Sequence, residues 1–361
     1  MPISKVYDTW KRKIQQLRPK ERLNRVKTMA WLMAGIFASR SVQLSRVASK
    51  IPGSALRTSV TRRLERWVAN AQIRVREWYE PVIQRILSAQ GGREFRLVVD
   101  GSKVGPWHQL LLVSLAYRHR TIPIAWMWVP KSRGHSTAAR QLALLGYVHD
   151  LLPIHAQVLL VGDQEFGAIE VIRQLDGWHW QYVLRQKGSQ LFRSDANTPW
   201  KAFGEVIHKA GQAVWVGAVE YTQSHAYPTH LLADWRPGET EPWLLATNLP
   251  NLATALKAYR RRAWIEATFG DLKDNGFDLE NSRLHTAMHL HRLTLAVMLL
   301  YLDMLATGSR TIKNGLRHLV DRSNRRDLSI FRIGLYMRDR CLANDLSFPI
   351  HLLPVLSQTV G

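Results

Sequence analysis

The feature of this sequence that most restricts its fold is a change of hydrophobic period near residue 95. Up to residue 88, apolar residues recur every three or four positions, as they do on one face of a helix. From Phe95 onward the chain turns to short, nearly continuous apolar runs that are typical of buried strands. Helical stretches separate some of these runs, which predicts the order β-β-β-α-β-α-β. An α/β fold with helices packed on a sheet is therefore expected.

The predicted strands are "FRLVVDGS", "HQLLLVSLAY", "TIPIAWMWV", "AQVLLVGDQEFG" and "WQYVLRQK", and the third is expected to be buried on both faces. "STAARQLALLGYVHDLL" and "GAIEVIRQLDG" are predicted helices. Residues 188–257 change character again, to short strands between Gly, Pro and Asp turns, which predicts a β-rich insertion. Helix returns afterwards, including a buried helix over residues 286–306 whose apolar run is too short for a membrane span.

The charge of the chain is strongly positive and unevenly placed. Fifty Lys and Arg residues against 28 Asp and Glu residues give a formal net charge of +22. Residues 1–90 hold 19 basic and 5 acidic side chains, and residues 308–340 hold 9 and 3, whereas the middle is nearly balanced. Two basic flanks around a neutral centre favour contact with nucleic acid from the flanks. A basic protein kept soluble by its charge, or one that binds an anionic membrane, is the alternative.

The N-terminal region, residues 1–88, is expected to be helical and to bind DNA. A short helix with Leu44 and Val47 inward, a turn at "IPGS" and a basic helix have the order of a helix-turn-helix. Ser54 is expected to cap the second helix, and Leu56 to lie on its buried face. A plain helical hairpin with a charged exterior fits the pattern equally well. The candidate DNA contacts on the second helix are Arg57, Arg62, Arg63 and Arg66.

Two acidic residues end strongly apolar strands. Asp100 follows "FRLVV" and Asp163 follows "VLLVG", and ligands bind at the carboxyl ends of strands in α/β sheets. Taken singly, Asp100 also fits an Asp-Gly turn, and Asp163 fits a helix cap. Together with a glutamate on a later helix, they could hold two divalent cations, which suits phosphodiester chemistry. Oxygen ligands favour Mg²⁺ or Mn²⁺, and a single cysteine, Cys341, excludes a Cys-based zinc site.

The stretch "YRRRAWIEATFGDLK" supplies that glutamate. On one continuous helix, Tyr259, Arg262, Glu266 and Lys273 fall at offsets 0, 3, 7 and 14, which places them on one stripe about 60° wide. The acid would then lie among three groups that can bind phosphate. For this helix in isolation, a solvated face is the alternative.

These residues resemble the DDE transposases of bacterial insertion sequences, specifically the insertion sequence four family. The signature of that family is Tyr-x2-Arg-x3-Glu-x6-Lys, which Tyr259, Arg262, Glu266 and Lys273 meet in full. "VVDGS" and "GDQEFG" match the two aspartate motifs, except that Gln164 stands where Arg is commoner. The departure puts one auxiliary contact in doubt and leaves the metal ligand in place.

The resemblance also implies the domain plan. The family interrupts an RNase H-like core with a β-rich insertion, which suits the 103 residues between the second and third acids. The N-terminal DNA-binding region is expected at residues 1–88, and the two parts of the catalytic core at residues 89–187 and 258–307. The insertion is expected at residues 188–257, and the basic C-terminal region at residues 308–361.

What the resemblance implies about activity is cut-and-paste DNA transposition. Asp100, Asp163 and Glu266 would be the catalytic metal ligands for two Mg²⁺ ions, or Mn²⁺. Water would nick a transposon end, the freed 3′-hydroxyl would form a hairpin, and after hairpin opening the final 3′-hydroxyl would attack target DNA. Each step is an in-line displacement at phosphorus, so one site can serve all of them.

The same resemblance assigns DNA contacts. Tyr259, Arg262 and Lys273 would bind phosphates of the end DNA. Trp243, in "EPWLLATNLP", would stack on a base flipped out for the hairpin step. A tryptophan packed in the core of the insertion is the alternative reading of Trp243.

The expected partners are the terminal inverted repeats of the element and target DNA, with a dimer in the synaptic complex and no membrane. The N-terminus has no apolar segment of a secretory signal, so a cytoplasmic protein, nucleoid-associated when bound to DNA, is expected. His285 and His289 lack a third ligand, and a helix flank near DNA is preferred to a zinc site. A catalytically silent DNA-binding protein and an RNase H-fold nuclease remain alternatives.

Overall fold

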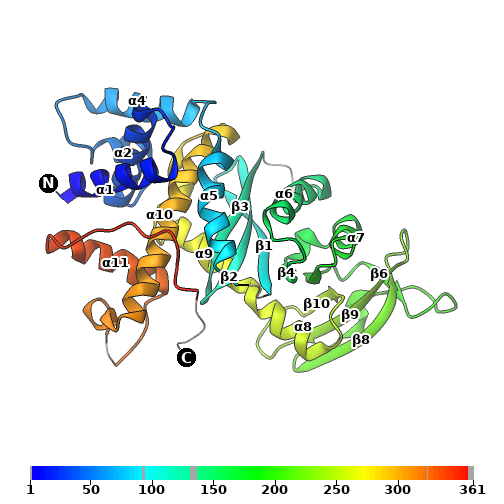
Figure 1. Cartoon of the computed structure of the whole chain (residues 1–361). Helices are drawn as coiled ribbons and strands as arrows, with labels where there is room; N and C mark the ends of the chain where they lie inside the picture. Colours follow the sequence, from blue (N-terminus) through cyan, green and yellow to red (C-terminus); the bar gives the residue numbers. More distant parts are fainter. Residues whose placement is uncertain (1, 92–93, 131–135, 323, 357–361) are drawn as a thin grey trace.

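The computed structural model describes residues 2–91, 94–130, 136–322 and 324–356. A ten-stranded mixed sheet runs through the molecule in the order β3-β2-β1-β4-β5-β10-β9-β8-β6-β7 (Figure 1). The strands of its first half are β1 (Phe95–Val104), β2 (His108–Tyr117), β3 (Arg120–Pro130), β4 (Val158–Gly162) and β5 (Gln181–Arg185). Those of its second half are β6 (Leu191–Arg193), β7 (Lys201–Ala202), β8 (Gln212–Tyr221), β9 (Tyr227–Trp235) and β10 (Trp243–Thr247).

The predicted order β-β-β-α-β-α-β is confirmed. Strands β1, β2 and β3 form an antiparallel meander, and β4 and β5 lie parallel to β1. The crossovers are α6 (Ala138–Leu151) and α7 (Ile169–Gly177). Strand β3 ends the row of strands in the sheet, yet nearly all of its residues are buried, because α6, α9 (Ala263–Leu272) and α10 (Ala287–Lys313) cover it.

The strands expected in residues 188–257 are present, and they extend the same sheet. Strand β10 pairs antiparallel with β5, with Leu245 opposite Arg185, and β9, β8, β6 and β7 follow outward. These strands project away from the N-terminal helices in Figure 1. Helix α8 (Leu252–Tyr259) then returns the chain to the central part of the sheet, where it contacts β4 and β5.

Helix α10 (Ala287–Lys313) is the buried helix that the sequence predicts, but it is longer than expected. Its apolar faces pack on β3, α5 (Val75–Ser88) and α11 (Ile330–Ala343). Trp128 Nε1 of β3 donates a hydrogen bond to Thr294 Oγ1 of α10 at 2.9 Å. Among the described residues, α10 is the one helix long and apolar enough to cross a membrane. Of its most apolar window, 94% is buried inside the protein, so α10 forms part of the core.

The N-terminal region is helical, as expected. It contains α1 (Pro2–Leu17), α2 (Leu23–Ser39), α3 (Leu44–Ala48), α4 (Arg57–Ala69) and α5 (Val75–Ser88). The connection between α3 and α4 is longer than predicted: α4 begins after Leu56, which is 73% exposed, and Ser54 makes no cap. The expected tight turn is therefore wrong, since residues 49–56 form an extended loop rather than a turn of three or four residues.

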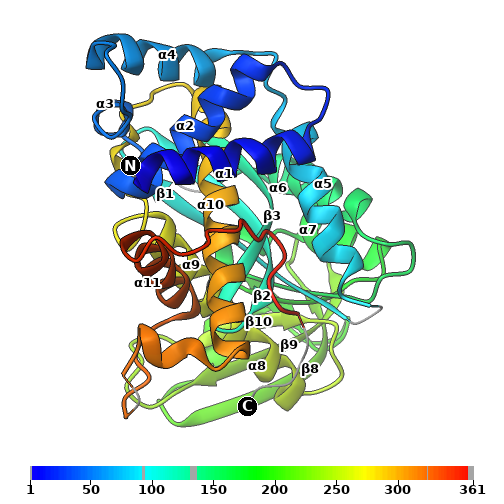
Figure 2. The same ribbon diagram turned by 60° about the vertical axis from the view of Figure 1, so that its left-hand side comes forward.

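The C-terminal region returns to the N-terminal helices. Helix α11 (Ile330–Ala343) packs on α10, and the following segment, residues 344–356, runs across α10 beneath α1 (Figure 2). Lys5 of α1 forms an ion pair with Asp345 at 2.8 Å. Both ends of the described chain are thus held against the same part of the core.

Candidate active site

Asp100 lies within β1, where that strand is flanked by β2 and β4. In β2 its register partner is Leu112. On the other side, the preceding residue Val99 pairs with Gly162 of β4. Because side chains alternate across a strand, Asp100 points to the face covered by α9, and Gly101 points to the opposite face. The Asp100 side chain is buried, and its Oδ1 accepts a hydrogen bond from the backbone N–H of Gly101 at 2.7 Å.

Asp163 is the first residue after β4, and it precedes a single 3-10 turn at Gln164–Phe166. Strands β1 and β4 are parallel with Val99 opposite Gly162, so the next residues, Asp100 and Asp163, are neighbours at the same end of the sheet. The Asp163 side chain does not cap the helical turn that follows it. The capping alternative is therefore not realised.

The third acid comes from a helix that is less regular than predicted. Helix α8 ends at Tyr259, a 3-10 turn covers Arg260–Arg262, and α9 (Ala263–Leu272) ends just before Lys273. The prediction of one continuous helix is therefore wrong. The backbone nevertheless stays right-handed through the 3-10 turn, so Arg262 and Glu266 remain on one face.

The Arg262 guanidinium connects the three predicted acids. Its Nη1 lies 3.3 Å from Asp100 Oδ2 and 4.0 Å from Asp163 Oδ2, and its Nη2 pairs with Glu266 Oε1. We call these four side chains the acid cluster. The structure thus brings together three carboxylates that are 63 and 103 residues apart in sequence.

Charge is unbalanced in the acid cluster, because three carboxylates share one guanidinium. Burial raises the pKa of Asp100 to about 7, and the charges of Asp163 and Glu266 act in the same direction. The Arg262 guanidinium and the Gly101 N–H oppose this rise in pKa without cancelling it. Near neutral pH the cluster therefore has capacity for further positive charge, supplied either by protons or by a bound cation.

A divalent cation fits the chemistry of these side chains. An internal cation already lies among the three carboxylates, and oxygen donors are the ligands that Mg²⁺ and Mn²⁺ prefer. Within the described residues, no three His, Cys, Asp or Glu side chains are close enough to form a metal site by themselves. The acids are instead held apart around Arg262, which would have to move for a metal to bind all three.

Two members of the predicted phosphate-binding stripe have partners within the protein. Tyr259 is 1% exposed, and its ring packs edge-on against Trp243 with ring centroids 4.9 Å apart. Lys273 Nζ donates to Lys103 O at 2.7 Å and pairs with Glu280 Oε1 at 2.6 Å. Lys273 would therefore have to exchange Glu280 for a phosphate, and the assignment of both residues to DNA stays a prediction.

Trp243 is the first residue of β10 and lies beside Tyr259, at one end of the stripe. It is half-buried, and Arg236 lies over its ring, with Cζ 3.8 Å from the ring centroid. The Tyr259 ring packs edge-on against it. Stacking a base on the face of Trp243 that Arg236 covers would require Arg236 to move away.

The four arginines of α4 are all exposed, as expected: Arg57, Arg62, Arg63 and Arg66. Two of them, Arg62 and Arg66, line a groove of about 770 Å³ between α4 and the segment before α10. The same groove is lined by Arg283, His285 and His289. The two histidines thus lie beside a basic surface, and among the described residues they have no third metal-ligating neighbour.

A set of residues that no sequence motif indicated holds the loop after Asp163. Glu165 accepts hydrogen bonds from the backbone N–H and the hydroxyl of Ser136, both at 2.5 Å, and from Gln109 Nε2 at 2.7 Å. Gln141 donates to the Glu165 carbonyl oxygen at 2.9 Å. The glutamate of "GDQEFG" was the one available signal, since its partners are distant in sequence.

Comparisons with known proteins identify the family. Residues 88–302 match the family model described as a transposase DDE domain. No curated protein matches the sequence. A similar solved structure is a cryo-EM structure of a piggyBac transposase synaptic complex with hairpin DNA, with 11% identity, a TM-score of 0.46, and coverage of 99% of this chain and 84% of that one. Because the family match spans more than half of the sequence, this protein belongs to the DDE transposases, a family of DNA-cleaving and strand-transferring enzymes.

Proposed function

We propose that this protein is a cut-and-paste DNA transposase of the insertion sequence four family. The observation that carries the proposal is the convergence of Asp100, Asp163 and Glu266, from β1, the end of β4 and α9, on one guanidinium. The full Tyr-x2-Arg-x3-Glu-x6-Lys signature supports the same assignment. The meander β1–β3 with parallel β4 and β5 is consistent with an RNase H-like core.

The three carboxylates would hold two Mg²⁺ or Mn²⁺ ions. When bound, such ions activate an attacking oxygen and stabilise the leaving oxygen of a phosphodiester. Arg262 has to leave the acids for this to happen, and a DNA phosphate is the natural acceptor for a guanidinium that has been released. In this scheme Arg262 holds the carboxylates apart before DNA arrives and binds the DNA backbone afterwards.

The remaining residues would position DNA. Arg57, Arg62, Arg63 and Arg66 of α4 would bind the terminal inverted repeat within the N-terminal region, and Lys273 would hold backbone near the cleaved bond. Trp243 would receive the flipped base once Arg236 has moved. Two ends must be synapsed before strand transfer, so we propose a dimer on DNA, with the free protein cytoplasmic and nucleoid-associated when bound.

Incubation of the protein with linear DNA that bears the ends of its own element, with and without Mg²⁺, tests the proposal. Hairpin-ended products that depend on Mg²⁺ and on the terminal repeats are expected. Binding of ends without any cleavage would instead indicate a catalytically silent DNA-binding protein. Nicking that is indifferent to the terminal repeats would indicate an RNase H-fold nuclease.

A further inference from the structure

A second charged site lies between α1 and the C-terminal segment. It is a pocket of about 200 Å³ lined by residues of α1, α5, α10 and that segment. These four elements are drawn in Figure 2. Its charged or titratable side chains are Lys13, Arg85, Arg310 and His351, one from each of these four elements, and we call it the cation pocket. None of the elements that carry the three acids contributes to it, so a role for this pocket is independent of the proposed function.

The cations of this pocket have no acidic partner. No Asp or Glu lines the pocket, and within the described part of the chain neither Lys13, Arg85 nor Arg310 forms an ion pair. Arg310 Nε is buried without a hydrogen-bond partner. Asp303, the carboxylate beneath the pocket, accepts hydrogen bonds through Oδ1 from Arg338 and from the backbone N–H of His351 at 3.0 Å, whereas its buried Oδ2 has no hydrogen-bond partner within the described residues.

The clustering of positive charge perturbs the groups around it. Burial and the charges of Arg310, Arg338 and Lys13 lower the pKa of His351 to about 4. Burial, followed by the charge of Arg85, lowers the pKa of Lys13, and Asp303 only partly offsets this. Like charges that are partly buried, as Lys13 and Arg310 are, are unfavourable without a counter-charge.

We propose that the cation pocket binds a phosphate-bearing anion. Two guanidinium groups and an ammonium group around a small cavity provide the donors that recognise the oxygens of a phosphoryl group. An adjoining cavity of about 410 Å³ shares Lys13 and Ile350 with this one and adds Lys5 and Arg12 of α1. The two cavities together suit a ligand with two or more linked phosphoryl groups.

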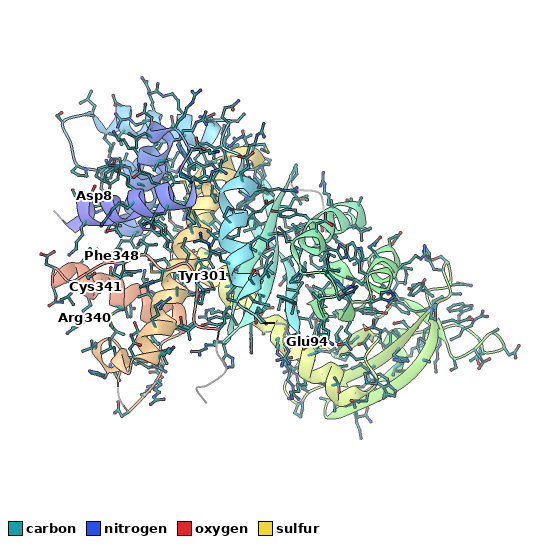
Figure 3. The ribbon with its side chains drawn as sticks, viewed as in Figure 1. Asp8, Glu94, Tyr301, Arg340, Cys341 and Phe348 are labelled. Atoms are coloured by element: carbon teal, nitrogen blue, oxygen red, sulfur yellow. The ribbon has the colours of Figure 1, made fainter. Side chains whose placement is uncertain are left out.

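The C-terminal segment forms the wall between these cavities. Phe348 is labelled in Figure 3 close to α11, and Arg338 Cζ lies 4.4 Å from the centroid of its ring. Ile350 lines both cavities. A bound anion would therefore tie the C-terminal segment to α1. Such an anion could be a free polyphosphate or the backbone of DNA, and binding of a DNA duplex distinguishes these two sources.

The test measures thermal unfolding of the full chain with pyrophosphate and with NaCl at matched ionic strength. Pyrophosphate is expected to raise the Tm by on the order of 5 °C beyond the effect of NaCl. Arg310→Gln and Lys13→Gln should each abolish that rise. Lys209→Gln should retain it, because Lys209 is an exposed lysine in the loop before β8 that forms no ion pair within the described residues.

Folding of the variants is checked by their behaviour without ligand. Because Arg310→Gln removes a repelled charge, its Tm in NaCl should equal or exceed that of the wild type. A clear loss of Tm in NaCl, with pyrophosphate stabilisation intact, would show that Arg310 is structural and would overturn the proposal. Equal pyrophosphate responses in the Arg310→Gln and Lys209→Gln proteins would overturn it as well.

The source of the phosphate is identified by binding of a duplex that lacks the terminal repeats. If DNA backbone fills the pocket, Arg310→Gln lowers the slope of log K against log salt by about one unit, and pyrophosphate competes with the duplex. If a free anion is the ligand, duplex binding stays unchanged while the pyrophosphate shift is lost. If Arg310→Gln changed neither the pyrophosphate shift in Tm nor the affinity for the duplex, there would be no anion site at this position.

Discussion

The acid cluster has an excess of negative charge, and the cation pocket has an excess of positive charge. In the acid cluster three carboxylates surround the single guanidinium of Arg262, whereas in the cation pocket Lys13, Arg85 and Arg310 surround no carboxylate at all. Each region responds through its most buried titratable group: burial and neighbouring acids raise the pKa of Asp100 to about 7, and burial and neighbouring cations lower the pKa of His351 to about 4. Both regions are therefore short of a counter-charge, one positive and one negative.

An internal charge can stand in for a ligand. Arg262 partly neutralises the acid cluster, so the fold tolerates that cluster without metal. In the cation pocket Asp303 only partly offsets the positive charge, since it lies outside the pocket lining and pairs with Arg338. We therefore expect the acid cluster to exchange one cation for another, and the cation pocket simply to gain an anion.

The largest expected effect comes from removing an acid. Glu266→Gln should reduce cleavage of DNA ends by on the order of 10³-fold or more, because metal-assisted phosphodiester chemistry depends on several kcal/mol of charge stabilisation. Asp100→Asn and Asp163→Asn should behave alike, with end binding nearly intact in all three. Cleavage is measured on labelled ends in Mg²⁺, with Asp274→Asn, an exposed acid just beyond α9, as the control. Normal cleavage by any one of the three would remove that residue from the site.

Removing the internal cation should have an intermediate effect, on stability rather than chemistry. Arg262→Gln leaves Asp100 buried without its partner, which should lower the free energy of unfolding in EDTA by about 2 kcal/mol. Mn²⁺ should then stabilise the variant more than the wild type, because no guanidinium competes for the acids. Thermal unfolding in EDTA and in Mn²⁺ measures both effects.

Arg193→Gln provides the matched control, since Arg193 pairs with Glu220 at 2.6 Å at a comparable exposure but away from the acids. It should lose less stability than Arg262→Gln and show no added response to Mn²⁺. An equal response to Mn²⁺ in Arg262→Gln and the wild type would contradict the view that Arg262 competes with metal.

The cation pocket should show itself in the pH dependence of stability. The folded pKa of His351, about 4, lies below the unfolded value of about 6.5, so the unfolded chain binds more protons between these two values. The free energy of unfolding should therefore fall as pH falls from about 6.5 to about 4. The slope corresponds to at most one extra proton bound by the unfolded chain. His291, whose pKa is also lowered to about 4, contributes in the same window.

Urea unfolding of the wild type and of His351→Gln across this pH range isolates the share due to His351. Arg310→Gln should reduce that share without removing it, because burial is the larger cause of the lowered pKa. If the free energy of unfolding had the same pH dependence in the wild type and in His351→Gln, the pKa of this histidine would not be lowered in the fold. The contrast between the two regions would then lose its support.

The smallest effect is expected at the rim of the acid cluster. Lys273 is already paired with Glu280, so Lys273→Ala should lower the slope of log K against log salt by less than one unit. Arg63→Ala on α4, whose side chain is exposed, should lower it by about one unit. Glu280→Gln would free Lys273 and should tighten DNA binding slightly. A full unit lost in Lys273→Ala would show that DNA displaces Glu280 without difficulty.

Much of the architecture was predictable from local patterns. The apolar runs after Phe95 specify strands, and the motifs "VVDGS" and "GDQEFG" put two acids at the same end of parallel strands. These features follow from the period of side chains along a strand, which any short window of sequence contains. The third acid, Glu266, was indicated by the resemblance of its surroundings to the family signature.

Other features were beyond local patterns. Ser54 fits a helix cap by residue type, but α4 begins at Arg57, with Leu56 at the cap position and no side-chain cap. The network of Ser136, Gln109 and Gln141 around Glu165 joins residues from β2, α6 and its preceding loop. No spacing in the sequence relates them.

Local sequence patterns specify which elements form, where the three acids stand on them and which flanks are basic. Tertiary packing places Arg262 among the acids, buries Tyr259 and brings Lys13, Arg85, Arg310 and His351 into one pocket. The two differ because periodicity fixes only the face of a single helix or strand on which a side chain lies. The distance between charges on different elements, and hence their pKa values and the ligand they require, is set by how those faces pack.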